Sequence, residues 1–426
     1  MRNPKRRATE KGSRSNWYSY YAGYSDHFVR DALSSIGLHP EAQVLDPWNG
    51  SGTSTQLASE LGYHATGFDL NPVMVVVAKA RLLDYRAHGS LRKLARAIIN
   101  QASRLPLDST ATDPLTRWFD LTSASVIRTF DHAIQELLLD RDEYQRLYCS
   151  PLSEVSSLAA FFYVALFRST RGFLGPFLTS NPTWIKDGGP EDKLSVDRTT
   201  VNNAFLSNVA EMDSIISGST CATESHTRRH CRLEVASADS MPLPDAGIDA
   251  VVTSPPYLTR IDYVVATRPE LAILGCSRAE DDLMRDRMTG TPTMARREIK
   301  LSPHWGATSH NVLKEVETHR SRASSTYYFN YFVQYFDSMF RSLQEVDRIL
   351  VPGGKSVIVV QDSYYKELHI NLPRIVVEMG ESMGWSVATQ TNFKVGANLA
   401  AIHPRGREYR KVTKAVECAL VLNKQG

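Results

Sequence analysis

The chain has 426 residues, a formal net charge of +3, and hydrophobic and charged fractions of 42% and 22%. This length predicts two or three domains, or one large core with insertions, and the composition is that of a soluble globular protein. The sequence has no apolar run near the roughly 20 residues of a membrane span. Its basic N-terminus lacks the apolar segment of a secretory signal. The five scattered cysteines are typical of a reducing compartment, so we expect a cytoplasmic protein without membrane contact.

The small net charge excludes a uniformly basic protein that coats nucleic acid, but positive residues are clustered. The clusters lie in the N-terminal arm and in segments 227–232, 285–300, 318–322 and 404–414. Clusters of this kind can follow a phosphate backbone, and a solvated loop is the alternative for any single one.

The first predicted elements alternate between strand and helix. Residues 43–48 (QVLDPW) predict a short buried strand that stops at a Gly-rich turn, and 53–61 predict the helix that follows. Residues 64–72 (HATGFDLNP) predict a second strand, with another helix directly after it. Strand, Gly-rich turn, helix and strand open a doubly wound α/β sheet.

The alternation then breaks, because residues 83–230 are mainly helical in pattern. Predicted strands resume at 231–239 and 248–254, and a long helix and an antiparallel edge pair close the chain. We therefore expect an N-terminal arm, a core that is interrupted once by a helical insertion, and an irregular insertion within the core. The arm is residues 1–40, and the core is residues 41–82 plus 231–426. The helical insertion is residues 83–230, and the irregular insertion is residues 259–325.

The turn NGSG lies between two acids that each end a strand. Gly50 and Gly52 allow a tight turn that brings backbone amides close to a ligand, and the next helix offers its N-terminus. Asp69 ends the neighbouring strand, where a carboxylate can accept hydrogen bonds from ribose hydroxyls. Asp239, at the end of the third predicted strand, could hold an adenine amino group. The alternatives are a tight structural turn for the glycines and a surface acid for Asp239.

The fourth predicted strand ends in TSPPY at the same sheet edge. The exocyclic amine of a base is a poor nucleophile, because its lone pair is delocalised into the ring. The Ser254 hydroxyl and the Pro255 carbonyl can each accept one N–H hydrogen and so direct that lone pair outward. Pro256 stiffens the turn, and Tyr257 offers an aromatic face for stacking.

These segments resemble a known family. LDPWNGSGTS, GFDLNP and TSPPY resemble motifs I, II and IV of the amino-methyltransferases, which methylate exocyclic amines of bases. Residues 16–33 resemble motif X, with Tyr20, Ala22 and Tyr24 at positions that line the methionine end of the cofactor. The serine before the two prolines resembles the cytosine-N4 DNA methyltransferases, whereas an aspartate is more usual in the adenine-N6 enzymes. The chain departs from the family at Trp48 and Asn49, where Phe and a small or acidic residue are common.

The resemblance implies the fold, the cofactor and the substrate. The fold is the class I methyltransferase fold: α/β, doubly wound, with a mostly parallel seven-stranded sheet, an antiparallel edge strand and a large helical insertion. The cofactor is S-adenosyl-L-methionine, and the substrate is a cytosine flipped out of double-stranded DNA and methylated on N4, without a metal. A restriction-modification context follows, in which a cognate restriction endonuclease is a candidate partner.

The site residues are implied in two groups. The catalytic group is Ser254, Pro255, Pro256 and Tyr257. The cofactor-binding group is Tyr20, Asp46, Pro47, Asn49, Gly50, Gly52, Thr53, Asp69, Asn71 and Asp239.

Sequence-specific contact with DNA must come from other residues, and the helical insertion occupies the place where one class of these enzymes carries its target-recognition region. Within it, RSTRGFLGPFLTSNPTWIK (168–186) combines basic, amide and aromatic side chains that can read base edges. A packed loop is the alternative. The candidate DNA contacts are Arg168, Arg171, Asn181, Trp184, Lys186 and Arg260; for Arg260 the alternative is a structural salt bridge with Asp262.

Three other interpretations compete with this one. An adenine-N6 DNA methyltransferase is the nearest, because base specificity is inferred from one serine. An RNA or protein-glutamine methyltransferase ranks lower, since NPPY or DPPY is more usual there. A catalytically silent nucleic-acid-binding subunit with the same fold is the third. The Cys and His residues of CATESHTRRHC have no usual zinc spacing, and a linker is expected there.

Overall fold

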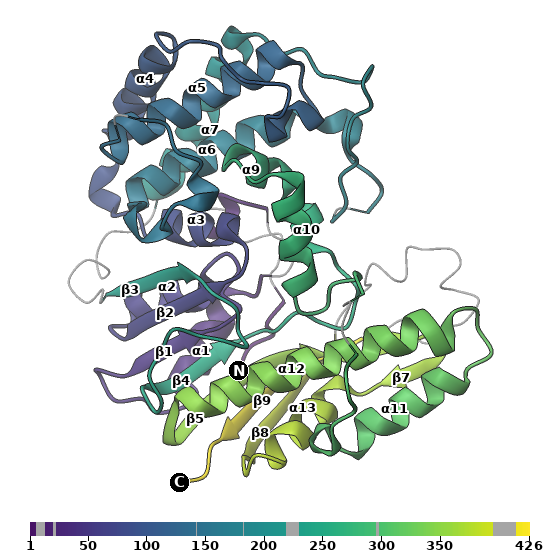
Figure 1. Cartoon of the computed structure of the whole chain (residues 1–426). Coiled ribbons are helices and arrows are strands. Elements are labelled where there is room, and N and C mark those ends of the chain that lie inside the picture. Colours follow the sequence, from purple (N-terminus) through teal and green to yellow (C-terminus); the bar gives the residue numbers. More distant parts are fainter. Residues whose placement is uncertain are drawn as a thin grey trace.

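A seven-stranded sheet lies at the centre of the protein in its computed structural model (Figure 1). The structure describes residues 1–5, 13–19, 23–141, 143–181, 183–218, 230–294, 298–394 and 415–426. The strands of the sheet are β1 (Gln43–Asp46), β2 (His64–Asp69), β3 (Cys231–Val235), β4 (Ile248–Thr253), β5 (Leu350–Gln361), β8 (Ser386–Lys394) and β9 (Val416–Asn423).

The strand order is β3-β2-β1-β4-β5-β9-β8. The first five strands are parallel, and β9 runs antiparallel to both β5 and β8. The antiparallel pair expected at one edge is therefore present, with the reversed strand one place in from that edge. The expected class I methyltransferase fold is confirmed. The order reverses between β1 and β4, which is the point where doubly wound sheets bind ligands beyond the carboxyl ends of their strands.

Helices cover both faces of the sheet, because successive strand residues point to opposite sides. Val44 packs in a cluster with α1 and α2, whereas Leu45 packs in another with α12 and α13. The helices that follow the doubly wound pattern are α1 (Asp26–Ser35), α2 (Thr53–Glu60), α3 (Pro72–Arg81), α12 (Phe329–Ile349) and α13 (Leu372–Glu381).

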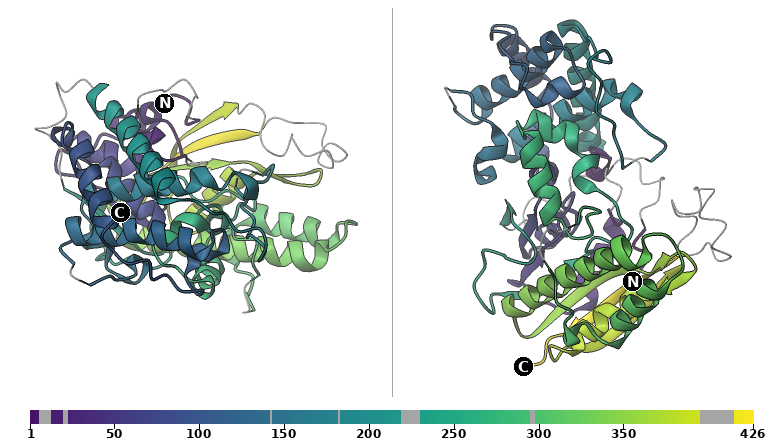
Figure 2. Two further views of the ribbon diagram at one scale, coloured as in Figure 1. Left: turned by 90° about the horizontal axis from the view of Figure 1, so that it is seen from above. Right: turned by 45° about the vertical axis from the view of Figure 1, so that its right-hand side comes forward.

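A separate helical region stands on the β3 side of the sheet (Figures 1 and 2). It contains α4 (Leu91–Ala102), α5 (Leu121–Leu138), α6 (Ser157–Phe173) and α7 (Arg198–Gly218). The segment 259–325, expected to be irregular beyond its start, contributes α8 (Tyr263–Ala266), α9 (Arg268–Ile273), α10 (Arg278–Arg287) and α11 (Ala307–Thr318). Residues of α3 and α9 share one buried cluster with α4 to α7, so the helical region and the core pack as neighbours.

Three local details differ from the sequence expectations. The third strand ends at Val235 rather than at 239, so Asp239 lies in the following turn. The fifth strand already begins at Leu350, which pairs with Ile248 of β4; the register with β4 then shifts across the expected turn VPGGK, and pairing with both β4 and β9 continues from Lys355. A small hairpin of β6 (Ser363–Tyr365) and β7 (Leu368–Ile370) was not expected. No helix in the described ranges is long and apolar enough to cross a membrane.

The guanidinium of Arg128 ties the helical region to α9. It is 8% exposed and contacts the carboxylates of Asp113 at 3.0 Å and Asp131 at 2.7 Å. It also donates to the backbone carbonyls of Ala272 and Ile273, at 2.9 and 2.6 Å. Those carbonyls end α9, where a cation is favoured by the helix dipole.

Arg128→Ala should therefore lower the free energy of unfolding by about 3–5 kcal/mol, because it leaves two largely buried carboxylates without their cation. Urea unfolding followed by circular dichroism measures this. Lys93→Ala, on the exposed face of α4, is the matched control and should change stability by less than about 0.5 kcal/mol. An Arg128→Ala protein as stable as this control would contradict the interpretation.

Candidate active site

The buried carboxylate of Asp46 joins the two loops that the sequence predicted to face each other. Its Oδ1 accepts from Thr253 Oγ1 at 2.6 Å and from the Trp48 amide at 3.1 Å, and its Oδ2 accepts from Ser54 Oγ at 2.6 Å. The Tyr24 hydroxyl contacts the same Oδ2 at 3.2 Å. Burial raises the pKa of Asp46, and these hydrogen bonds oppose that rise. Asp46 thus links β1 to β4 through protein contacts alone.

The Gly-rich turn needs left-handed backbone at both glycines. Gly50 has φ 49° and Gly52 has φ 83°. The Gly50 amide donates to Asp69 Oδ2 at 2.9 Å, which joins the turn to the end of β2. Gly52 caps α2, and a Cβ there would lie 2.6 Å from the Cβ of Ala78 on α3. The second glycine therefore allows α2 and α3 to meet as well as the chain to turn.

Gly52→Ala should lower the melting temperature by several degrees. The left-handed backbone costs roughly 1–2 kcal/mol for an L-residue, and the clash with Ala78 adds to that cost. Differential scanning fluorimetry measures the change. Gly89→Ala is the matched control, since Gly89 has φ 84° but a Cβ there would meet nothing within 4 Å. Equal shifts in both variants would show that the contact with Ala78 adds nothing.

A buried arginine supports the Gly-rich turn from behind. Arg81, at the end of α3, is 1% exposed and donates to the Ser51 carbonyl at 3.0 Å, to Thr53 Oγ1 at 3.0 Å and to Gln56 Oε1 at 2.8 Å. Its guanidinium also lies 3.8 Å from Asp26 of α1. These contacts hold the residues around Gly52 in one conformation.

Asp69 keeps free acceptor positions at the sheet edge. Its two oxygens accept one backbone amide each, from Gly50 at 2.9 Å and Asn71 at 2.8 Å. A carboxylate has about four lone-pair sites, so about two remain for a ligand. Burial raises the pKa of Asp69 to about 6, and the two amides oppose the rise. In contrast to Asp46, this carboxylate can bind a pair of hydroxyls.

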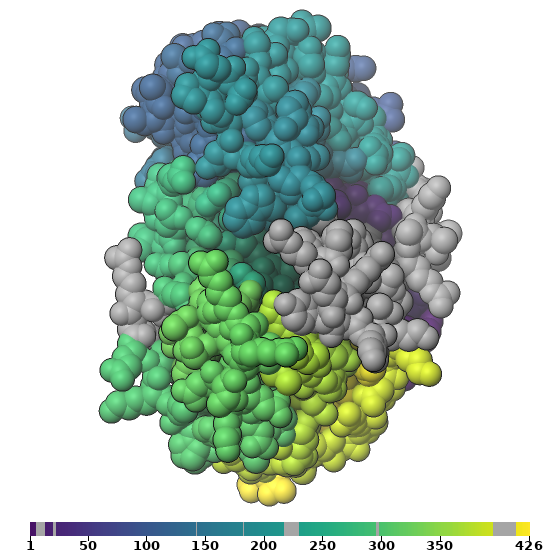
Figure 3. Space-filling view, turned by 90° about the vertical axis from the view of Figure 1, so that its right-hand side faces the viewer, coloured from purple at the N-terminus to yellow at the C-terminus, as the bar shows by residue number. Residues whose placement is uncertain are grey.

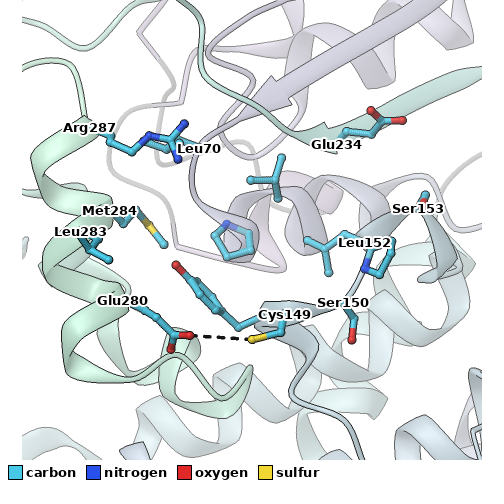
Figure 4. A pocket seen from close by; sticks show the side chains of 14 residues that line it. Leu70, Cys149, Ser150, Leu152, Ser153, Glu234, Glu280, Leu283, Met284 and Arg287 are labelled. Atoms are coloured by element: carbon cyan, nitrogen blue, oxygen red, sulfur yellow. Dashed lines mark hydrogen bonds between the residues drawn. The ribbon is translucent and has the colours of Figure 1, made fainter. Parts of the chain in front are cut away.

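Leu70, the residue after Asp69, lines a pocket of about 640 Å³ (Figure 4). Val235 of β3, the register partner of Asp69, lines the same pocket. The other walls come from the loop before α6 and from α10, and Figure 4 shows their side chains around the same space. The remaining lining residues are Pro72, Tyr148, Cys149, Ser150, Pro151, Leu152, Ser153, Glu234, Glu280, Leu283, Met284 and Arg287.

Ser254 directly follows Thr253, so it lies beside the Asp46 contact. Its Oγ is 3.2 Å from the Val359 carbonyl of β5 and 3.2 Å from the Tyr257 hydroxyl. Either contact can take the serine proton and leave the oxygen lone pairs available to a substrate amine. The Tyr257 hydroxyl donates in turn to Glu417 Oε1 of β9 at 2.7 Å.

The double proline is held by a long helix. Pro255 is buried, and the Pro256 carbonyl accepts from the Tyr335 hydroxyl of α12 at 2.8 Å. Arg260 follows with φ 59° and lies over the rings of Tyr327 and Tyr328, with its guanidinium carbon 5.2 Å from each ring centroid. The salt bridge with Asp262 considered from the sequence is not formed, because Asp262 caps α8 and pairs with Arg285.

The other predicted cofactor residues have structural partners or lie outside the described residues. Tyr20 and Ala22 lie outside them. Pro47 and Asn49 are buried, and Asn49 accepts from Thr55 at 2.9 Å. Asn71 caps α3 and donates to Thr267 at 2.7 Å. Asp239 pairs with Arg341 of α12 at 2.7 Å and does not line the pocket.

The predicted DNA contacts separate into two groups. Arg168 pairs with Glu211 at 2.6 Å, and Arg171 binds both oxygens of buried Glu270 at 2.5 and 2.6 Å, so these two guanidiniums are engaged within the protein. The exposed loop after α6 carries three others, Asn181, Trp184 and Lys186, and Arg260 lies after TSPPY as described above. Trp184 is 41% exposed, and Asn181 and Lys186 are also exposed.

Sequence reasoning missed four residues of this site. All four lie in helices or strands: Thr253, Arg81, Tyr335 and Glu417. Three of them bind partners more than 75 residues away in the chain, and Arg81 binds Gln56, 25 residues away. An arginine within the apolar run of α3 was the one available signal, because an arginine is almost never fully buried without partners. Thr253 opens the TSPPY motif but was given no role of its own, and Tyr335 and Glu417 carried no local signal.

No protein-family model matches the chain. It is 24% identical over 290 residues to the Type II methyltransferase M.BsoBI of Geobacillus stearothermophilus. The alignment covers 63% of this chain and 54% of M.BsoBI. The chain thus spans about half the length of M.BsoBI. It is 21% identical over 394 residues to the Type II methyltransferase M.AvaI of Nostoc sp., covering 87% of this chain and 79% of the relative.

A solved structure of an SAM-dependent methyltransferase from Methanosarcina mazei aligns over 92% of this chain and 97% of its own, with 9% identity and a TM-score of 0.32. The fold rests on the strand order given above. The chain is similar in sequence to Type II methyltransferases.

Proposed function

We propose that this protein transfers the methyl group of S-adenosyl-L-methionine to the exocyclic N4 of a cytosine flipped out of a specific double-stranded DNA sequence. One observation carries the proposal: the Ser254 loop and the Gly50 turn follow adjacent parallel strands and are joined by the 2.6 Å bond from Thr253 to Asp46. An amine acceptor and a cofactor turn at one edge can serve a single reacting methyl group. The similarity to two Type II methyltransferases supports a role in restriction-modification.

The residues at this edge fit the cofactor. Asp69 has lone pairs left for two ribose hydroxyls, and the pocket beside Leu70 and Val235 has room for the adenine, with both apolar and polar side chains in its lining. The left-handed turn at Gly50 and Gly52 keeps side chains away from the space above it. When bound, the cofactor supplies a methyl group that its sulfonium already activates.

The chain's own residues then orient the amine. Ser254 Oγ and the Pro255 carbonyl accept the two N–H hydrogens, and so turn the nitrogen lone pair toward the cofactor turn. Both acceptors also stabilise the positive charge that develops on nitrogen during transfer. The groups are preorganised, since the serine proton has partners in Val359 and Tyr257 and the next proline carbonyl is held by Tyr335.

A base within a duplex cannot reach this edge, so it must leave the stack at a cost of a few kcal/mol. Stacking on Tyr257 offsets part of this cost. Arg260, held over two tyrosine rings beside the loop, is positioned to meet the phosphate backbone next to the flipped base.

We assign target recognition to the helical region, residues 83–230. The exposed loop residues Asn181, Trp184 and Lys186 are its candidate DNA contacts. Figure 3 shows the face of the molecule on which this region lies above the C-terminal half of the core, and we expect the duplex to bind on this face.

Mass spectrometry of nucleosides tests the reaction. DNA from a methylation-deficient host, incubated with the protein and the cofactor, should yield N4-methylcytosine.

Ser254→Ala should lower the turnover by about 10²–10³-fold with the cofactor Kd unchanged within a factor of two, because one of two amine acceptors is lost. Asp69→Ala, the contrasting variant, should raise the cofactor Kd. N6-methyladenine as product would identify the adenine enzyme instead. Cofactor binding without any product would identify a silent subunit, and wild-type turnover in Ser254→Ala would refute the role of that hydroxyl.

Cofactor affinity should depend on pH through Asp69. Its pKa is raised to about 6, so the carboxylate that accepts ribose hydroxyls is lost as the pH falls through about 6. Calorimetric titration from pH 7.5 to 5 should show weakening affinity with a midpoint in that region. The free energy of unfolding of the unliganded protein should change in the opposite direction. It should rise as the pH falls below about 6, because the folded state binds the Asp69 proton more tightly than the unfolded state does. Asp69→Asn should bind weakly at every pH and lack the midpoint.

A further inference from the structure

One carboxylate beside the reacting serine is left unused by the proposed mechanism. Glu417 lies at the second position of β9 and is 9% exposed. Its Oε1 accepts from the Tyr257 hydroxyl at 2.7 Å, whereas its Oε2 is buried with no hydrogen-bond partner among the described residues. Burying a carboxylate with one oxygen unsatisfied is costly, and a glutamine could accept the tyrosine proton without that charge.

Few charged groups in the described part of the chain act on Glu417. Its register partners are Gln361 of β5 and Phe393 of β8, both uncharged. Of the residues that the structure describes, the Tyr257 hydroxyl and the charge of Lys5 in the N-terminal segment act on it. Burial raises the pKa of Glu417, and the Tyr257 hydrogen bond and the charge of Lys5 oppose the rise. A carboxylate with a raised pKa is a better proton acceptor near neutral pH than an ordinary one.

A continuous line of hydroxyls connects this carboxylate to the amine site. Ser254 Oγ lies 3.2 Å from the Tyr257 hydroxyl, which lies 2.7 Å from Glu417 Oε1. The other acid at this strand end does not offer the same route. Asp362 accepts the Val416 amide at 2.7 Å and pairs with His369 at 2.9 Å, so both of its oxygens are engaged.

We infer that Glu417 receives the proton that the methylated nitrogen must release, through the hydroxyls of Ser254 and Tyr257. The inference rests on the proposed function. The amine nitrogen forms a bond to the methyl carbon with its lone pair, and the carbon–sulfur bond breaks with its electrons left on sulfur. The nitrogen then carries one proton too many.

That proton moves in three linked transfers. Ser254 Oγ takes it from nitrogen as it passes its own proton to the Tyr257 oxygen, and Tyr257 passes its proton to Glu417 Oε1. Both hydroxyls end neutral, and Glu417 ends protonated. Glu417 does not touch the substrate, so it is a positioning and relay residue, and it must be ionised before each turnover.

Single-turnover methyl transfer measured against pH tests the relay, with enzyme in excess over unmethylated genomic DNA and tritiated S-adenosyl-L-methionine. Glu417→Gln should lower the rate constant about 10²-fold and flatten its rise with pH, with the cofactor Kd unchanged. Tyr257→Phe keeps the stacking ring but removes the hydroxyl, and should show the same loss and the same flat profile. The double variant should be no slower than either single one, because both break one path.

Glu381→Gln is the matched control, because it removes the same charge at an exposed position. Glu381 ends α13, before the start of β8, and therefore lies at the end of the sheet away from the carboxyl ends of the parallel strands. It should react as the wild type does. A wild-type rate and pH profile in Glu417→Gln, or losses that multiply in the double variant, would overturn the relay. Should Glu417→Gln not fold, Tyr257→Phe with an unaltered pH profile would overturn it as well. If the wild-type protein methylates no DNA, the proposed function itself fails, and the relay fails with it.

Discussion

The site depends on one buried carboxylate that is fully satisfied by its own protein. Burying the charge of Asp46 costs several kcal/mol, and hydroxyls from Ser54, Thr253 and Tyr24 together with one backbone amide offset that cost. These donors come from three separate parts of the chain. The charge is satisfied only when all three meet, so folding of the first strand, the fourth strand and the N-terminal segment is coupled to assembly of the site.

Three carboxylates at this edge have three different environments. Both oxygens of Asp46 are engaged, each oxygen of Asp69 accepts one backbone amide, and Glu417 has one buried oxygen without a hydrogen-bond partner among the described residues. The same functional group can therefore hold the scaffold, bind a ligand or take a proton, according to how many acceptor positions the fold leaves open. Burial raises the pKa of all three, but their hydrogen bonds decide what each can do.

The helical region is joined to the core next to the reactive loop. α9 begins eleven residues after Tyr257, and both Arg128 and Arg171 bind it from the helical region, the latter through buried Glu270. The helical region is therefore held against the segment that follows TSPPY. Under the proposed function, recognition and base positioning would share one rigid frame.

The sequence by itself determined the order of elements at the centre of the sheet and the two loops at its carboxyl edge. Their signals are local: apolar runs, glycines that allow left-handed turns, and the stiff double proline at Pro255 and Pro256. Strand ends, the small hairpin and the helices after TSPPY were less visible, since pairing between distant strands decides them. Tertiary structure alone decided which polar groups meet, placing Thr253 on Asp46 and Glu417 on Tyr257 across gaps of 207 and 160 residues. The physical reason is that a hydrogen bond depends on distance in space, and a distance of that kind leaves no periodic trace in the chain.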